Sequence, residues 1–275
     1  MSFIDILKAA VSVLSGGGVG VGDSLDMLNA DLAMRTCRAD GKLLHLDKPL
    51  TVTPLQLQRM ATHCKASVPH SCIGEIWSGY TALVGGHYFS TILVHSNNGL
   101  GSSQKREFVS PQLLGLEEMP QNELCYIIVQ KEGNMEGSIQ SLEYICTVIS
   151  DLVPIPIQKT DEWSIVYISP TYYIEGAQVA LIGELEKISM VSRDRISSID
   201  VNDYSVSVTT ICSDNTSEIV SMQWAYTFPL DPATWYTKTW DCECLPNKMV
   251  THTLTKQYDG DIFFYECIYQ DITIE

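Results

Sequence analysis

The sequence predicts a mainly β protein, an antiparallel β-sandwich that follows an N-terminal helical segment. Two observations support this prediction. From Ile73 onward, short runs rich in Val, Ile, Thr and Tyr alternate with turn residues, a pattern typical of antiparallel sandwiches. Of the 275 residues, 45% are hydrophobic and 18% are charged, a composition typical of a chain with a packed core rather than a disordered one.

Helical periodicity dominates the N-terminal part of the chain. Apolar residues recur at helical spacing at Ile4, Leu7, Val11 and Leu14. A second helix is predicted over residues 25–35, with Asp23 or Ser24 as its cap and an end near Asp40-Gly41. The run TPLQLQRMATHC, residues 53–64, predicts a third short helix. The change from helical spacing to short strand-like runs divides the chain into a helical segment, residues 1–45, and a β-sandwich domain, residues 46–275.

The predicted strands share a richness in β-branched and aromatic residues, and several alternate apolar with polar positions. They lie within residues 75–84, 87–96, 123–130, 138–150, 163–169, 177–185, 196–211, 218–226 and 261–274. The sequences SNNG, KEGN, VNDY and YDGD supply turns between some of these runs.

Charge and targeting features narrow the function classes. The formal net charge of −16 disfavours nucleic acid and anionic membrane surfaces, because both attract basic proteins. No apolar run approaches the roughly 20 residues that span a bilayer, and MSFIDILKAA lacks a signal-like leader. We therefore expect a cytoplasmic protein whose nine cysteines are mainly reduced, buried thiols. The sequon Asn215-Thr216-Ser217 matters only if the chain is secreted.

The stretch LSGGGVGVGD, residues 14–23, raises the question of a phosphate-binding loop. No register of its glycines satisfies Gly-x-Gly-x-x-Gly between a strand and a helix, and the preceding element is a predicted helix. A P-loop requires Gly-Lys-Ser/Thr, whereas Gly22 is followed by Asp23, whose carboxylate would repel phosphate. The pattern instead indicates a tight bend between helices.

Residues 9–44, AAVSVLSGGGVGVGDSLDMLNADLAMRTCRADGKLL, resemble the end of the catalytic barrel in α-galactosidases and raffinose-synthase-like glycosidases. The residues that match the family pattern are Ser15, Gly16, Gly17, Val19 and Asp23. Asp40-Gly41 matches the Asp-Gly pair that follows the next helix in the family. Gly18 departs from the pattern, because raffinose-synthase-like members usually have proline there. Motif-level similarity covers only about the first 45 residues, and the rest is similar in architecture and order.

The resemblance implies a (β/α)8 barrel followed by a β-sandwich, so that residues 1–45 would be a helical remnant of the barrel. Retaining enzymes of this kind use two carboxylates about 5–5.5 Å apart, which the family places on earlier barrel strands. This sequence would then lack the catalytic aspartates and would be inactive alone. Asp23 and Gly17 would lie near the sugar pocket, without a metal or cofactor. The first helix, shaped to pack on a barrel, could mediate self-association.

Other groups of side chains in the sequence could also form a site. The carboxylate pairs Glu117-Glu118, Asp161-Glu162 and Glu184/Glu186 are expected to be solvated turns or strand edges. A zinc site at His63, Cys64, His70 and Cys72 matches no closed ligand spacing. Trp224 is expected in the core, whereas Trp235 and Trp240 are candidates for stacking on sugar rings. The alternative function is therefore a carbohydrate-binding or protein-interaction module, and an unrelated role of the sandwich stays open.

Overall fold

The computed structural model describes residues 3–18, 29–63, 75–95, 106–116, 125–133, 139–148, 152–156, 163–228, 231–256 and 263–271. Its helices are α1 (Phe3–Leu14), α2 (Ala30–Met34), α3 (Pro54–His63) and the 3-10 turn η3 (Pro111–Leu114). The strands of the first part are β1 (Lys48–Val52), β2 (Glu75–Leu83), β3 (His87–His95), β4 (Arg106–Val109), β5 (Cys125–Gly133), β6 (Ile139–Val148), β7 (Val153–Pro156) and β8 (Trp163–Ile174). The later strands are β9 (Ala177–Glu184), β10 (Ile196–Val201), β11 (Ser205–Ile211), β12 (Glu218–Phe228), β13 (Asp231–Cys244), β14 (Lys248–Lys256) and β15 (Phe263–Asp271).

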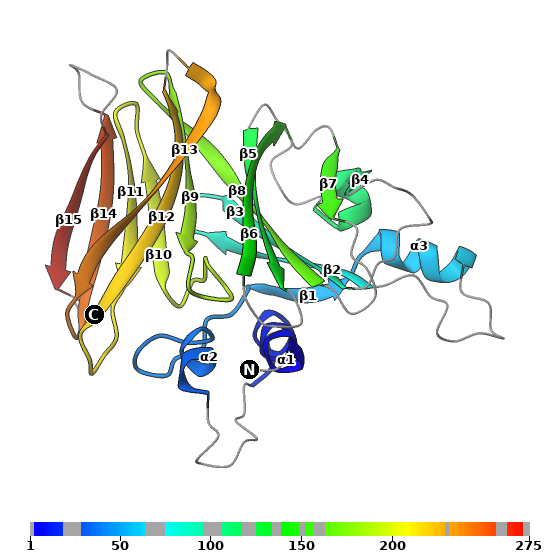
Figure 1. Ribbon diagram of the computed structural model, residues 1–275. Coiled ribbons are helices and arrows are strands. Elements are labelled where there is room, and N and C mark those ends of the chain that lie inside the picture. Colours follow the sequence, from blue (N-terminus) through cyan, green and yellow to red (C-terminus); the bar gives the residue numbers. More distant parts are fainter. Residues whose placement is uncertain are drawn as a thin grey trace. The chain divides into compact units, whose positions relative to one another are not determined.

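These strands confirm a mainly β protein with antiparallel sheets, because every pair of strands with a described register is antiparallel (Figure 1). The relation of the first 45 residues to a glycosidase barrel stays a prediction. The chain separates into two compact units. Unit one comprises Met1–Val11, Lys48–Tyr80 and Phe89–Ser169, and unit two comprises Ser12–Asp47, Thr81–Tyr88 and Pro170–Glu275.

Unit one contains helix α3 and the strand pairs β1–β2, β3–β8, β5–β6 and β4–β7. Pro54 opens α3 at a position where its missing N–H is not needed, and the Thr53 hydroxyl accepts a hydrogen bond from the Gln56 N–H at 3.2 Å. The third predicted helix is therefore confirmed. Strands β3 and β8 are almost continuously buried, as strands covered on both faces are.

The glycines after α1 begin with a helix cap. Gly16 adopts a positive φ of 72°, its N–H donates to the Val13 carbonyl at 3.1 Å, and the Gly17 N–H donates to the Ser12 carbonyl at 2.9 Å. This pair of hydrogen bonds is the Schellman motif, which satisfies the last carbonyls of a helix and favours glycine in the left-handed residue. The glycines thus follow a helix, as predicted. Asp23 lies outside the described residues.

Helix α2 begins later than the start predicted for the second helix. Its described cap is Asn29, whose side-chain oxygen accepts a hydrogen bond from the Leu32 N–H at 3.0 Å. Residues 19–28, which hold the predicted caps, lie outside the described residues. The loop after α2 turns at Gly41, whose φ is 83° and whose N–H donates to the Arg38 carbonyl at 3.0 Å.

The segment from α2 to the start of β1 docks on the connection between β9 and β10 in unit two. The Ile188 N–H donates to the Arg35 carbonyl at 2.9 Å, and the Lys187 ammonium donates to the carbonyls of Met34 and Cys37 at 2.8 and 2.7 Å. A cation near the end of a short helix satisfies carbonyls that lack helical partners. These bonds attach the helical segment to the sheets of its own unit.

The sheets of unit two form two layers. One has β9, β12 and β13 as neighbours, and the other has the order β10-β11-β14-β15 (Figure 1). Alternation along β11, β12 and β14 places Val208, Trp224, His252 and Leu254 in the core, each with no exposed surface. The prediction that Trp224 is a core residue is confirmed.

The expectation of mainly reduced cysteines is wrong for four of the five cysteines whose side chains are described. Cys212 pairs with Cys244, and Cys242 pairs with Cys267, while Cys37 is a buried free thiol. Cys242 and Cys244 share one face of β13, as expected from their spacing. The sequence could not show that Cys244 faces Cys212, just after β11, and that Cys242 faces Cys267 on β15. These segments approach β13 only in the folded chain.

Candidate functional site: an aromatic strip on β12, β13 and β15

Six aromatic side chains gather where strand β13, at the end of one sheet, faces strand β15, at the end of the other. We call them the aromatic strip: Tyr226, Phe228, Tyr236, Trp240, Phe263 and Tyr265. Alternation creates this set, because side chains two residues apart on a strand point to the same side. Cross-strand register adds to it, since Tyr226 of β12 lies directly opposite Tyr236 of β13.

The rings contact one another in sequence along the strip. Trp240 and Tyr265 are stacked, with ring centroids 4.9 Å apart and an angle of 11° between the planes. Tyr226 stacks on Tyr236 at 6.1 Å and contacts Phe263 at 4.9 Å. These separations lie in the range of favourable aromatic pairs, so the strip is a connected surface rather than a scatter of rings.

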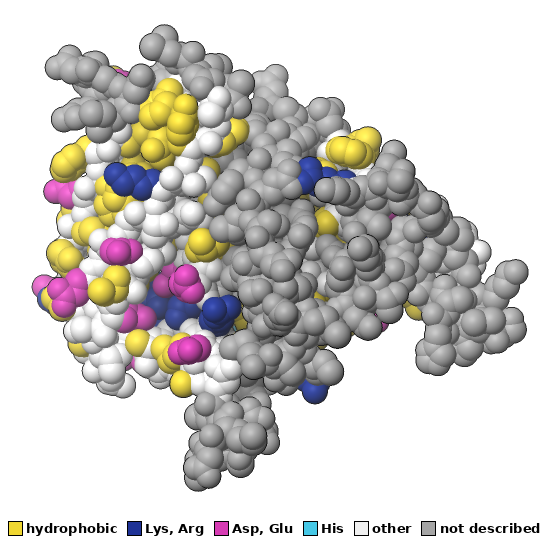
Figure 2. Space-filling view, in the orientation of Figure 1, with side chains coloured by type: hydrophobic (Ala, Val, Ile, Leu, Met, Phe, Trp, Pro, Cys, Tyr) yellow, Lys and Arg dark blue, Asp and Glu magenta, His cyan; other side chains and the backbone are white. Residues whose placement is uncertain are grey.

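The strip is only partly buried. Tyr236 is 39% exposed, and Trp240, Tyr226 and Phe263 have intermediate exposure. In Figure 2, hydrophobic side chains gather over the part of the molecule where Figure 1 draws the upper ends of β12 and β13, with basic side chains just below. Single exposed aromatic side chains are common on protein surfaces, but a contiguous set of partly exposed rings is typical of a recognition site.

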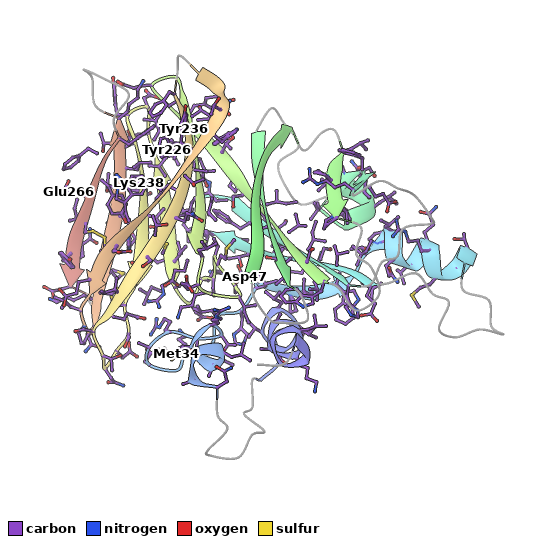
Figure 3. All side chains as sticks on the ribbon, in the orientation of Figure 1. Met34, Asp47, Tyr226, Tyr236, Lys238 and Glu266 are labelled. Atoms are coloured by element: carbon purple, nitrogen blue, oxygen red, sulfur yellow. A yellow bond between two sulfur atoms is a disulfide. The ribbon has the colours of Figure 1, made fainter. Side chains whose placement is uncertain are left out.

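A single cation accompanies the aromatic rings. The Lys238 ammonium lies 5.1 Å from the centroid of the Trp240 ring, a cation–π distance, and the side chain is exposed. Figure 3 shows Lys238 beside Tyr226 and Tyr236, with Glu266 on the outer side of β15. Lys238 makes no ion pair with any residue that the structure describes.

Strand alternation also separates the charges of the edge strands. On β13, Asp241 and Glu243 are odd-numbered and point away from the side that carries Tyr236, Lys238 and Trp240. Lys238 is thus the charged side chain that β13 places among the rings, although the whole chain carries a net charge of −16. Burial and the charge of Asp241 both raise the pKa of Tyr265, so the carboxylate on the other side of β13 still acts on the strip.

Buried groups hold the rings of the strip in position. The Tyr265 hydroxyl bonds to His252 Nδ1, and His252 Nε2 lies 2.9 Å from the Thr210 hydroxyl. Burial lowers the pKa of His252 to about 4, so the ring is neutral at pH 7. The disulfide between Cys242 and Cys267 joins β13 to β15 two residues beyond the stacked Trp240–Tyr265 pair.

Trp224 lies beneath the strip and has an unsatisfied polar atom. It is directly opposite Lys238 in the register of β12 and β13, and it is fully buried. Its indole N–H has no hydrogen-bond partner among the described residues. A buried donor without a partner costs about 1–3 kcal/mol, which makes it a feature that calls for a partner such as a water molecule or a ligand atom.

The structure separates the site residues that the sequence predicted. Trp240 lies in the strip, whereas Trp235, an odd number of residues away on the same strand, is on the other side of β13. Gly17 belongs to the cap of α1, and Asp23 is outside the described residues. Tyr226, Tyr236 and Lys238 were missed. The available signal was that Tyr236, Lys238 and Trp240 occupy every second position of one strand. The sequence does not show that β13 pairs with β12, and this pairing is what brings Tyr226 to the same side.

A second cluster of functional groups is buried around Arg195. Its Nε donates to Glu184 at 3.0 Å, and its two terminal nitrogens bind both oxygens of Glu218 at 2.8 and 2.9 Å. Glu184 is 5% exposed, so the expectation that it lies at a solvated edge is wrong; Glu186 is exposed as expected. The sequence did not reveal Arg195 as the partner that makes burial of Glu184 tolerable.

Burial and Arg195 act in opposite directions on these two carboxyl groups. Burial raises the pKa of Glu184. Burial also acts to raise the pKa of Glu218, but the bidentate Arg195 contact outweighs it and the pKa of Glu218 is lowered. Acid–base catalysis also requires separated pKa values. Here, however, both carboxylates are bound to the same arginine and the Glu218 oxygen also accepts the Ala39 N–H at 3.3 Å, so the cluster stabilises the fold.

The remaining predicted constellations have no described counterpart. No group of three or more His, Cys, Asp or Glu residues in the described ranges could hold a metal ion. Cys64, His70 and Cys72 lie outside those ranges. None of the helices in the part of the chain that is described has the length and apolarity that crossing a bilayer requires.

Comparison with known proteins gives no relative from which a site could be transferred. No protein-family model matches the sequence, and no curated protein sequence matches it. The aromatic strip is therefore the candidate site on the grounds of its geometry alone.

Proposed function

We propose that unit two binds carbohydrate through the aromatic strip. The observation that supports this most is the partly exposed, connected set of rings on β12, β13 and β15, with Tyr236 39% exposed. The C–H faces of sugar rings are apolar and flat, so they stack on aromatic side chains, while polar groups nearby bond to their hydroxyls. The proposal agrees with the resemblance of residues 9–44 to carbohydrate-active enzymes, which is itself a prediction.

Lys238 favours a carboxylate-bearing sugar over a neutral one. Its ammonium has no acidic partner in the described part of the chain, and Asp241 and Glu243 point to the other side of β13. Because Lys238 is exposed, its ion pair with a uronate would contribute up to about 1 kcal/mol, roughly two- to fivefold in affinity. The ligand class that we propose is therefore an acidic oligosaccharide such as an oligouronide.

Intrinsic tryptophan fluorescence tests this proposal, because Trp240 lies in the strip. We expect saturable changes on titration with trigalacturonate. The variant Trp240→Ala should lose the binding, whereas Trp235→Ala is the matched control, since it removes an indole from the other side of the same strand. Calorimetric titration of both variants avoids reliance on the removed fluorophore. Equal loss of binding in both variants, or no binding by the wild type to acidic or neutral sugars, would refute the proposal.

A pair of matched ligands separates the role of Lys238 from that of the rings. The methyl ester of trigalacturonate has the same skeleton without the negative charge. We expect Lys238→Gln to weaken binding of the acid about two- to fivefold and to leave binding of the ester nearly unchanged. If the wild type binds both ligands equally well, carbohydrate binding stands but the preference for acidic sugars is wrong.

The resemblance to α-galactosidases also predicts that residues 9–44 do not hydrolyse glycosides, because it assigns Asp23 to the sugar pocket and not to the pair of catalytic aspartates. Incubation with an aryl α-galactoside checks this. Turnover that Asp23→Asn abolishes would contradict it and would place a catalytic role on Asp23.

A further inference from the structure

The connection between β11 and β12 presents an asparagine in a sequence that glycosylating cells recognise. Asn215, Thr216 and Ser217 form an Asn-x-Ser sequon, and Asn215 is exposed. The Asn215 side chain makes no hydrogen bond with the residues that the structure describes. The acceptor amide is thus available at the surface.

The backbone around this sequon is a formed turn rather than a strand. The Ser213 hydroxyl lies 2.7 Å from the Thr216 hydroxyl and accepts the Thr216 N–H at 3.1 Å. The Asp214 N–H donates to an Asp40 carboxylate oxygen at 3.3 Å. A modification at Asn215 would therefore project from a turn that is anchored below it, and it would not disturb the core.

The disulfides provide an independent observation. Cys212–Cys244 and Cys242–Cys267 are both closed, and Cys212 is only three residues from Asn215. Two structural disulfides in one unit are typical of proteins that fold in an oxidising compartment and are rare in a reducing cytosol. In eukaryotic cells the oxidising compartment in which proteins fold is also the one in which N-glycans are added.

We propose that Asn215 is an N-glycosylation site and that unit two folds in an oxidising secretory compartment. The donor is a polyprenyl-diphosphate-linked oligosaccharide. A bond forms between the Asn215 side-chain nitrogen and the anomeric carbon, the anomeric C–O bond to the diphosphate breaks, and the amide nitrogen loses one proton as the diphosphate leaves. No electrons are exchanged. This proposal is an alternative to the expectation of a cytoplasmic protein, which stays a prediction.

The proposed glycan lies at the opposite end of β12 from the exposed rings of the aromatic strip. Glu218 begins the strand and pairs with Cys244, whereas Tyr226 pairs with Tyr236. At about 3.3 Å per residue, Tyr226 is roughly 25 Å from Glu218 along the strand, and Met222, the partner of Trp240, is roughly 13 Å from it. Glycosylation at Asn215 should therefore leave ligand binding at the strip unchanged, and the two proposals can fail separately.

Expression of the full chain behind a secretion signal in a glycosylating eukaryotic cell tests the proposal. We expect a form whose electrophoretic mobility increases after endoglycosidase treatment. Asn215→Gln and Ser217→Ala should both abolish this shift, whereas Ser217→Thr should keep it because threonine also completes the sequon. Ser217→Ala retains the asparagine, so it separates loss of the sequon from loss of the side chain.

The readout does not depend on successful secretion, because cell-associated chain is treated with the glycosidase as well. Mass spectrometry of the non-reduced protein maps the disulfides in the same sample. Wild-type chain that enters the pathway and stays unmodified at Asn215 would overturn the glycosylation site. Free thiols at Cys212 and Cys244 in that chain would overturn the assignment of the compartment.

Discussion

Replacing Arg195 by methionine should be among the most destabilising changes in unit two. The Arg195 side chain is 1% exposed and donates to Glu184, Glu218 and the Ile211 carbonyl at distances between 2.8 and 3.1 Å. Methionine has a similar length but no charge, so Arg195→Met removes the cation without leaving a large cavity. Two carboxyl groups would then be buried without a counter-charge.

The magnitude follows from the cost of leaving such groups unpaired. Removal of one partner from a buried ion pair costs about 3–5 kcal/mol, and here the arginine serves two carboxylates that are 6% and 11% exposed. We therefore expect Arg195→Met to lower the free energy of unfolding by at least about 3 kcal/mol at pH 7. The loss should shrink toward pH 4, because protonation neutralises the orphaned carboxylates in the variant.

The sign of this pH effect can be checked in the wild type. The pKa of Glu218 is lowered in the folded state, so its contribution to stability is present above the unfolded pKa of about 4.3 and is lost as the pH falls through the folded pKa. Acid therefore removes the Glu218 contribution from the wild type, whereas the raised pKa of Glu184 acts in the opposite direction. In the variant, acid relieves both unpaired carboxylates, so the difference between the two unfolding free energies should shrink.

Urea unfolding followed by far-ultraviolet circular dichroism at pH 7 and pH 4 measures this difference. Arg193→Met is the matched control, since Arg193 is 60% exposed and lies 3.8 Å from Asp47. An exposed pair contributes little, so the control should change stability by about 0.5 kcal/mol or less. If Arg195→Met were as stable as Arg193→Met at pH 7, the buried cluster around Arg195 would not stabilise the fold.

Three further predictions concern the same unit. Gly183→Ala should lower the free energy of unfolding by about 3 kcal/mol or more, because a Cβ would lie 2.2 Å from the Met190 carbonyl oxygen and φ is 99° at this position. A variant that unfolds in urea like the wild type would contradict this. The lowered pKa of His252, about 4, predicts that charging it between pH 6.5 and 4 destabilises the fold by up to about 3 kcal/mol. His252→Gln should flatten that part of the pH–stability curve, and an unchanged curve would exclude the histidine as its cause. The Cys242–Cys267 disulfide should be reduced before the fully buried Cys212–Cys244 disulfide, because Cys267 is partly exposed. Its reduction should lower the free energy of unfolding by about 3–4 kcal/mol, since it joins residues 25 positions apart. Alkylation followed by mass spectrometry checks the order of reduction.

The helix over residues 3–14 and the strands near residues 163–169, 177–185 and 218–226 were predictable because their signals are local. Apolar side chains repeat at helical spacing before Leu14, and β-branched residues dominate the later runs. The cap at Gly16 follows the same logic, since a glycine after an apolar helix commonly ends it. The start of α2 at Ala30 was less predictable, because Asn29 competes with several other capping residues upstream.

The candidate site was only partly predictable. Trp235 and Trp240 looked equivalent in the sequence, since both are tryptophans on one expected strand. The register of β13 with β12 separates them, and the approach of β15 supplies Tyr265 as the stacking partner of Trp240. A contact between residues 25 positions apart on different sheets has no local signal.

The sequence by itself determined the class of this protein: a mainly β chain with a helical start and a net charge of −16. Those properties depend on composition and on periodicities shorter than about ten residues. Only the tertiary structure decided which cysteines pair, which arginine neutralises Glu184, and which aromatic rings lie together. Each of these contacts joins strands that are distant in the chain, and the register between strands decides them.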